Sequence, residues 1–146
     1  MQTPTCPKSP LRVLMLSDVF FPRINGVSTS IETFRADLRG EDVEVTLVAP
    51  RYPESHPGNA TLRVPSTRLP FDPEDRLMHW PALKRATDSL DAARFDLIHI
   101  QTPFAAHYAG VRAARRRGVP VITTYHTHFE EYAAHYLPLL PRPLLK

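Results

Sequence analysis

A buried-strand pattern, a glycine-bearing loop and an amphipathic helix follow one another in the first forty residues of the chain. Residues 11–17 form a nearly unbroken apolar run, which is typical of a strand buried on both faces of a parallel sheet. Apolar residues then recur at helical spacing over residues 27–39, so that they would form one stripe. A sheet buried on both faces needs covering layers on both sides, and this stretch therefore predicts an α/β fold.

The remaining chain repeats the alternation of strand and helix patterns. Short apolar runs bounded by turn residues indicate four further strands, and two longer segments with helical periodicity indicate helices. The expected strands are 43–50, 61–65, 95–100 and 119–124, and the expected helices are 76–91 and 103–117. This order predicts a Rossmann-like parallel sheet of five strands flanked by helices.

Local signals predict where these helices begin and end. Gly40 and Gly118 follow the helical patterns at positions where glycine commonly ends a helix. Thr102 precedes Pro103, and this pair predicts a capped start with proline at the first helical position. Pro81 is expected either to disturb the early part of the second helix or to set its first turn.

The loop between the first strand and the first helix offers a cradle for an anion. Backbone N–H groups at a helix start lack partners within the helix, and the helix dipole favours negative charge there. Gly26 has no Cβ and lets a ligand approach the backbone closely. Asn25 is one candidate to cap this helix, and Thr29 with Glu32 is the other, as a capping box. An ordinary strand-to-helix turn explains the same residues equally well.

Composition places the chain among globular proteins. At 146 residues it is long enough for one domain with a core, and 42% of its residues are hydrophobic. The formal charge of +3 does not by itself argue for a nucleic-acid partner, and Arg115–Arg117 lie where cations complement a helix dipole. Cys6 is the single cysteine, so no internal disulfide can form, which fits a reducing, cytoplasmic compartment. No stretch resembles a membrane span or a signal peptide.

The two ends of the chain differ in character from its middle. Residues 1–10 are rich in proline and predict a disordered leader. Residues 11–137 are expected to form the Rossmann-like domain. Residues 138–146 are interpreted as a severed linker or the start of a next helix, because the chain stops on an apolar stretch without a closing strand. The sequence therefore predicts a domain that is cut short.

Three segments of the chain resemble motifs of a known enzyme family. Residues 17–27, Ser-Asp-Val-Phe-Phe-Pro-Arg-Ile-Asn-Gly-Val, resemble the first loop of the family-4 retaining glycosyltransferases, which have the GT-B fold. Residues 98–104, Ile-His-Ile-Gln-Thr-Pro-Phe, resemble the family's His-Val-His-Thr-Pro segment. Residues 125–130, Tyr-His-Thr-His-Phe-Glu, resemble its Tyr-His-Thr-Asp-Phe segment. The resemblance covers about residues 11–146 and implies the N-terminal half of such an enzyme.

The resemblance implies transfer of a sugar, with retention, from an NDP-sugar donor to a lipid or polyol acceptor at the cytoplasmic membrane face. It implies neither a metal nor another cofactor. A C-terminal Rossmann-like domain, which would supply paired glutamates and most of the donor site, is missing from this chain and is its expected partner. We therefore expect the 146-residue chain to be inactive alone. Peripheral membrane contact is a further expectation, and a nucleic-acid partner is not expected.

The resemblance also implies roles for six residues. His126, directly after the fifth strand, is expected to be the catalytic residue and to contact the donor sugar or the acceptor. The residues expected near the donor diphosphate are Gly26 and Asn25, and those expected in the acceptor or sugar cleft are Asp18, Thr127 and Tyr125. Two positions depart from the family pattern, with His128 in place of Asp and Gln101 in place of His, and these departures bear on the identity of the acceptor.

Other kinds of site find weaker support. His126 and His128 would share one face of a strand and could hold a metal with His135, but the sequence has no His-Glu-x-x-His pair and no cysteine partner there. A serine-hydrolase elbow is absent, and Glu130 with Glu131 does not by itself indicate a glycosidase. The alternative from another class is a stand-alone, non-catalytic α/β module that binds a phosphate ligand at its glycine-bearing loop.

Overall fold

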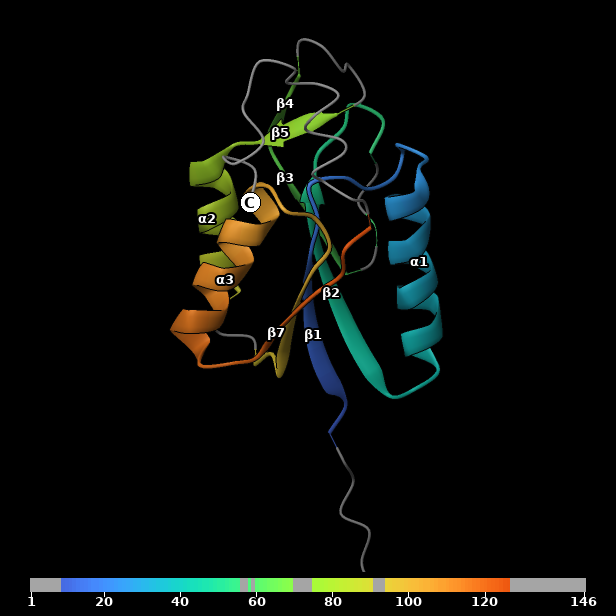
Figure 1. Cartoon of the computed structure of the whole chain (residues 1–146), viewed down its shortest axis with the longest axis vertical. Helices are drawn as coiled ribbons and strands as arrows, with labels where there is room; N and C mark the ends of the chain where they lie inside the picture. The colour runs from blue at the N-terminus through green and yellow to red at the C-terminus, as the bar shows by residue number, and fades with distance from the viewer. Residues whose placement is uncertain (1–8, 56–57, 59, 70–74, 91–93, 127–146) are drawn as a thin grey trace, which may run out of the picture.

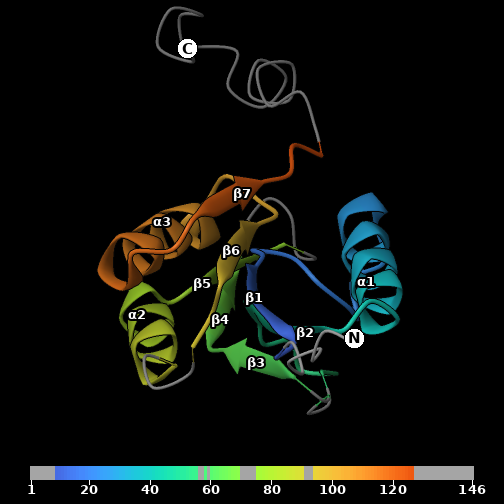
Figure 2. The same cartoon turned by 90° about the horizontal axis from the view of Figure 1, so that it is seen from below.

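A five-stranded parallel sheet with helices on both faces forms the body of the chain. The computed structural model describes residues 9–55, 58, 60–69, 75–90 and 94–126. The sheet strands are β1 (Leu11–Leu16), β2 (Val43–Pro50), β3 (Thr61–Val64), β6 (Leu97–Ile100) and β7 (Val121–Thr123), and the helices are α1 (Gly26–Arg39), α2 (Trp80–Ser89) and α3 (Ala105–Arg117). The strand order in space is β3-β2-β1-β6-β7. Helix α1 covers one face, and α2 and α3 cover the other (Figure 1, Figure 2). The predicted α/β class and the five parallel strands are confirmed.

Strand β1 lies at the centre of the sheet and is buried on both faces, as its apolar run predicted. It pairs in parallel with β2 on one side and with β6 on the other. Leu14 and Leu16 pack in the core under α2 and α3, whereas Met15 packs with Ile31 of α1 on the opposite face. Each of these four side chains has no exposed surface. The two sets of alternating side chains therefore hold both helical layers to one strand.

Helix α3 lies close to the sheet because it presents small residues to it. Ala106, Ala109 and Ala113 are buried in the same core as Ile100 of β6. A Cβ added to Gly110 would lie 2.7 Å from Cγ1 and 2.8 Å from Cδ1 of Ile100. The absence of a side chain at this position is therefore required by the packing of α3 on β6.

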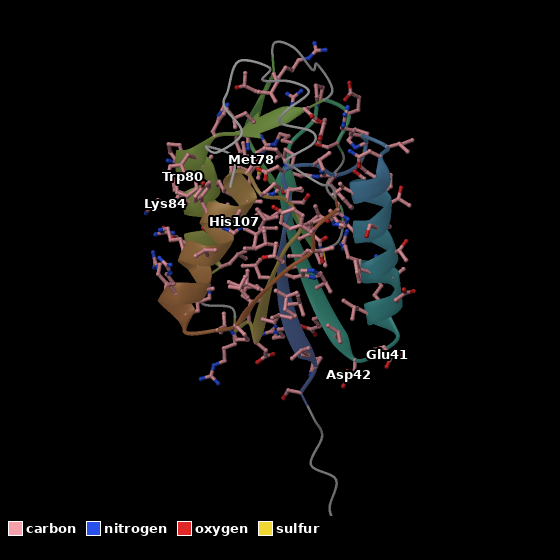
Figure 3. The ribbon with its side chains drawn as sticks, in the orientation of Figure 1. Glu41, Asp42, Met78, Trp80, Lys84 and His107 are labelled. Atoms are coloured by element: carbon pink, nitrogen blue, oxygen red, sulfur yellow. The ribbon has the colours of Figure 1, made fainter. Side chains whose placement is uncertain are left out.

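A short antiparallel hairpin that the sequence analysis missed lies next to the sheet strands. It consists of β4 (Ser66–Arg68) and β5 (Arg76–Met78). The helix predicted over 76–91 was therefore wrong in its first residues, and α2 begins at Trp80 (Figure 3). Pro81 lies in the first turn, where a missing N–H removes no helical hydrogen bond. Strands of three residues are too short to show an alternation from which they could be predicted.

The helix ends follow the sequence signals in part. Gly118 is left-handed, with a φ of 66°, and ends α3 as predicted. Gly40 ends α1 in a right-handed conformation, with a φ of −79°, and the left-handed residue in this turn is Asp42 (Figure 3). Thr102 does not cap α3, because that helix begins only at Ala105. Its hydroxyl group is instead bonded to a buried carboxylate from another loop.

One carboxylate joins the two helices on the same face of the sheet. Asp88 of α2 lies 2.8 Å from Nη1 of Arg112 and 3.0 Å from Nη1 of Arg116, both on α3, and 3.1 Å from Nζ of Lys84. Hydrogen bonds from Arg112 and Lys84 hold the pKa of Asp88 well below its usual range. Part of the arginine-rich end of α3 therefore has an anionic partner within the fold.

Several expectations fall outside the residues that the structure describes. They include most of the leader 1–10, the segment 138–146, and Thr127 and His128. Among the described helices, none combines the length and the hydropathy that a membrane crossing needs.

We expect Gly110→Val to destabilise the chain by about 2 kcal/mol, since overfilling a well-packed core costs ~1–3 kcal/mol. Urea unfolding followed by circular dichroism measures this change. Gly26→Ala is the matched control, because a Cβ at Gly26 would meet no atom within 4 Å, and it should shift the free energy of unfolding by less than about 0.5 kcal/mol. A Gly110→Val variant as stable as the wild type would contradict the close packing of α3 on Ile100.

Candidate functional site

A pocket opens at the carboxyl edge of the sheet. Helices α1, α2 and α3 begin at this edge (Figure 1). Its volume is about 460 Å³. The walls come from the loop after β1, the β4–β5 hairpin, the loop between β6 and α3, and the segment after β7. In open α/β sheets, ligands bind outside the carboxyl ends of the strands. The position of this pocket is therefore the one that the fold favours for a ligand.

Four of the six sequence-predicted site residues line this pocket. They are Asp18, Asn25, Tyr125 and His126. Gly26 lines a second hollow, which runs along α1. Thr127 lies outside the described residues. The structure thus brings together residues from the first loop and from the end of the fifth sheet strand, as the sequence analysis expected.

Asp18 ties the first loop to the start of α3. Its Oδ2 accepts a hydrogen bond of 2.7 Å from the hydroxyl of Thr102. The backbone N–H of Ala106 lies 3.1 Å from Oδ1 and 3.2 Å from Oδ2. The Asp18 N–H in turn donates to the Thr102 hydroxyl over 2.7 Å. A carboxylate from a distant loop therefore does the work of the helix cap that Thr102 was predicted to provide.

The Asp18 carboxyl group is almost completely buried, with 8% of the residue exposed. Burial raises the pKa of Asp18 above its ordinary value, although the hydrogen bonds from Thr102 and Ala106 act in the opposite direction. The hydrogen bonds and the helix N-terminus compensate part of the cost of burying this group.

Asn25 caps α1, which decides between the two caps that the sequence left open. Its Oδ1 accepts a 2.8 Å hydrogen bond from the Ser28 N–H. The alternative capping box is not formed, because Glu32 lies inside the helix and pairs with Arg35 and Arg39 at 3.3 Å and 3.2 Å. Glu32 therefore takes none of the N–H groups at the helix start.

Gly26 is the first residue of α1, and its conformation does not demand glycine. The positive-φ glycine among the described residues is Gly118. An added Cβ at Gly26 would meet no atom within 4 Å. Neither backbone strain nor packing in the described part of the chain therefore explains a glycine at this position.

A chain of side-chain contacts runs along the ends of β6 and β7. His126 Nε2 lies 2.7 Å from Oε1 of Gln101. The Gln101 Nε2 lies 3.1 Å and 3.3 Å from the two ring nitrogens of His99. His99 Nε2 lies 2.7 Å from the Thr124 hydroxyl. The sequence motifs pointed to His126, and Gln101 departs from the family pattern, but no sequence signal indicated that the two would be in contact.

Both histidines of this chain of contacts favour the neutral imidazole. Burial lowers the pKa of His99, and His126 lowers it further through charge repulsion. Burial also lowers the pKa of His126. Because desolvation disfavours the charged form, these rings are held as hydrogen-bonding groups in the neutral state.

The hairpin contributes a wall that sequence analysis missed entirely. Leu69, Arg76 and Leu77 line the pocket from this side. Arg23 of the first loop forms an ion pair with Asp75, the residue before β5, with 3.0 Å between Nε and Oδ1. No sequence signal pointed to these residues, since their place at the pocket follows from a hairpin that was not predicted.

The described residues do not support the alternative of a metal site. Within the part of the chain that the structure describes, no three His, Cys, Asp or Glu side chains gather as a metal site would require. His128 and His135, which the alternative also invoked, lie outside the described residues.

Comparison with known proteins shows which enzymes this chain is similar to. The family model described as Glycosyltransferase Family 4 matches residues 24–146. The chain is 31% identical over 137 residues to the alpha-monoglucosyldiacylglycerol synthase of Streptococcus pneumoniae, which covers 91% of this chain and 31% of that protein. It is 32% identical over 147 residues to the GDP-mannose-dependent alpha-mannosyltransferase of Mycobacterium tuberculosis, with 90% and 36% covered. The chain thus spans about a third of the length of these curated relatives.

Solved structures also resemble the fold. The C-terminal domain of a hydrogenase from Pyrococcus furiosus superposes with a TM-score of 0.54, covering 85% of this chain and 99% of that one. At 11% sequence identity this likeness concerns the fold alone.

Asp18→Ala should lower the free energy of unfolding by about 3 kcal/mol, because it leaves the buried Thr102 hydroxyl and Ala106 N–H without their acceptor. Urea unfolding measures the loss. Asp37→Ala on the exposed side of α1 is the matched control and should change stability by less than about 0.5 kcal/mol. If the two variants were equally stable, Asp18 would not hold the loop to α3.

We expect the chain to lose stability as the pH falls from 8.0 to 5.5, and His99 to carry part of the loss. The unfolded chain protonates His99 near pH 6.5, whereas the folded chain has a lower pKa there. Below that pH the unfolded state therefore binds more protons, and protonation favours unfolding. Urea unfolding at both pH values, compared between the wild type and His99→Gln, isolates this contribution. The same pH dependence in both proteins would exclude His99 as a cause.

Proposed function

The chain belongs to glycosyltransferase family 4, and on this premise we propose that it is the N-terminal, acceptor-side domain of a retaining glycosyltransferase. The proposed reaction moves a sugar from an NDP-sugar donor to a lipid or polyol acceptor. The names of two relatives support these classes, since one is a monoglucosyldiacylglycerol synthase and the other depends on GDP-mannose. A lipid acceptor would place the reaction at a membrane face, and we propose the cytoplasmic one.

The pocket at the carboxyl edge is the observation that carries this proposal. It gathers His126, Asn25 and Asp18 from segments far apart in the sequence. A volume of about 460 Å³ is within the range of ~300–1,000 Å³ that small-molecule sites occupy. The pocket is lined by apolar side chains, among them Leu69, Leu77 and Phe104, together with polar ones, which suits an acceptor with both kinds of surface.

We assign to His126 the contact with a hydroxyl group of the donor sugar or of the acceptor. Burial favours its neutral ring, in which one nitrogen donates and the other accepts a hydrogen bond. This role makes His126 a catalytic residue in the sense that it orients the reacting groups. Positioning of that kind can supply several kcal/mol of the barrier reduction, on the order of 7–11 kcal/mol at most.

The start of α1 is the proposed site of the donor diphosphate. Asn25 satisfies the Ser28 N–H, and the other N–H groups of the first turn remain available to an anion by the geometry of a helix start. The open space in front of Gly26 leaves room for a phosphate group against the backbone. The two hollows that Asn25 and Gly26 line would then hold adjacent parts of one donor.

The proposed mechanism uses no protein nucleophile from this chain. The Asp18 carboxylate already accepts hydrogen bonds from Thr102 and Ala106, so we assign to it the task of shaping the pocket wall together with Tyr125 and Thr127. Retention would rely on the donor phosphate to stabilise the charge that develops at the sugar. No metal is invoked. The remaining two thirds of a full-length protein would supply the second domain and its paired glutamates.

Gly26→Val in the full-length protein tests the donor site. We expect it to reduce sugar transfer at least ~100-fold, as a misplacement of about 1 Å can, while stability stays near the wild-type value because the new side chain meets open space. The assay follows radiolabelled sugar from a panel of NDP-sugars into diacylglycerol vesicles and into soluble polyols, and NMR of the product reads the anomeric configuration. Gly40→Ala, at the other end of α1, is the matched control and should retain activity.

Four results would count against this proposal. Wild-type transfer by Gly26→Val would remove the assigned role of the α1 start. Inversion at the anomeric carbon would exclude retention. Tight binding of a nucleotide sugar without transfer to any acceptor would favour the non-catalytic, phosphate-binding module. The isolated 146-residue chain should transfer no sugar in the same assay, and sustained transfer by it would show that a second domain is not required.

A further inference from the structure

Gln101 occupies the centre of the contacts that hold His126. Both the residue pairs His99–Thr124 and Gln101–His126 connect the end of β6 to the end of β7, with the same separation of 25 residues. His99 and Gln101 are two residues apart along the chain, and so are Thr124 and His126. Residues at this spacing on an extended strand lie on one face of the sheet. Gln101 therefore lies between a buried histidine and the histidine that lines the pocket.

The position of Gln101 is fixed by more than its side chain. Only 1% of the residue is exposed. Its backbone N–H donates to the Leu16 carbonyl over 2.9 Å, and the Thr124 N–H donates to the Ile100 carbonyl over 2.9 Å, so both strand ends are held by the sheet. A side chain that is locked by packing on a rigid element can orient a functional group more tightly than a loop residue can.

The contact with Gln101 also determines which nitrogen of His126 carries the proton. An amide oxygen has lone pairs and no hydrogen, so it can only accept a hydrogen bond. The Gln101 Oε1 faces His126 Nε2 at 2.7 Å, while the amide nitrogen, which donates, is directed to the His99 ring at 3.1 Å and 3.3 Å. This orientation of the amide favours a neutral His126 that carries its proton on Nε2 and keeps a lone pair on Nδ1.

We propose that Gln101 is a positioning residue that holds His126 in its Nε2-protonated tautomer, so that Nδ1 accepts a hydrogen bond from a hydroxyl group of the bound sugar or acceptor. This inference rests on the proposed function for the hydroxyl partner, whereas the tautomer is inferred from the orientation of the Gln101 amide. An amide is suited to this task because it offers an acceptor without a negative charge. A carboxylate in the same place would favour the imidazolium, which has no lone pair to offer.

The tautomer can be measured directly on the full-length protein labelled with [15N]histidine. Two-bond 1H–15N correlation spectra distinguish Nε2-protonated, Nδ1-protonated and doubly protonated rings. We expect wild-type His126 to be Nε2-protonated at pH 7.5. Gln101→Met, which keeps the length and removes the acceptor, should give a mixture of tautomers, and Gln101→Glu should shift His126 toward the doubly protonated form.

His79 is an internal control in the same spectra. It too pairs with a side chain, with 2.6 Å between its Nε2 and the Thr67 hydroxyl, and it lies outside the Gln101 contacts. Its signals should therefore be unchanged in both variants. In the transfer assay Gln101→Met should lower kcat on the order of 10-fold with a much smaller change in the donor KM, as expected when orientation of an existing catalytic group is lost.

The outcomes separate this inference from the proposed function. An Nδ1-protonated His126 in the wild type would overturn it, even if the protein transfers sugar. A Gln101→Met protein with the wild-type tautomer would also overturn it, because His126 would then be held by something else. An Nε2-protonated ring that Gln101→Met releases would support it even if no NDP-sugar is a substrate, in which case the proposed function alone would fail. The wild-type spectrum gives an answer even if a substitution at Gln101 prevents folding.

Discussion

The pocket depends on one buried carboxylate. Asp18 accepts hydrogen bonds from Thr102 and from the first turn of α3, and its own N–H donates back to Thr102. These bonds join the loop after β1 to the loop after β6, which are 84 residues apart in the chain. Because parallel strands place both loops at the same edge of the sheet, a single side chain can fix the width of the opening between them. The two loops that line the pocket are therefore joined to each other by this link.

A feature of this fold could be predicted from the sequence where it depends on residues close to one another in the chain. The apolar run of β1 has a signature within a few residues, and the strand it predicted is confirmed. The first helix offered two local cap signals, and the structure forms the one at Asn25. The cap of α3 has no such signature, because its acceptor comes from Asp18 in a distant loop, and the local signal at Thr102 was misleading. The β4–β5 hairpin was missed for a related reason, since strands of three residues are stabilised by their pairing and not by a pattern of their own.

The residues of the site also divide into those with a local sequence signal and those without one. Sequence motifs singled out His126, Asn25 and Asp18, and the structure places all three at one pocket. The motifs could not predict which side chains contact His126. Its contact with Gln101 follows from the parallel pairing of β6 with β7. The hairpin wall could not be predicted either, since it needs Leu77 and Arg76 to be placed by a three-dimensional pairing. Composition and spacing identify chemical groups, whereas the sheet decides which groups meet.

If the start of α1 receives the donor diphosphate, as proposed, the neutral state of His126 has a further consequence. Phosphate charges brought to the start of α1 would favour the imidazolium form of a nearby histidine. Burial of the ring opposes that shift, and an uncharged amide partner adds nothing to it. The ring can then remain a hydrogen-bond acceptor while the donor is bound, so that recognition of a hydroxyl group does not depend on the protonation that the donor itself would induce. The charged side chains Asp18 and Arg23 of the described pocket are likewise engaged with partners in the fold.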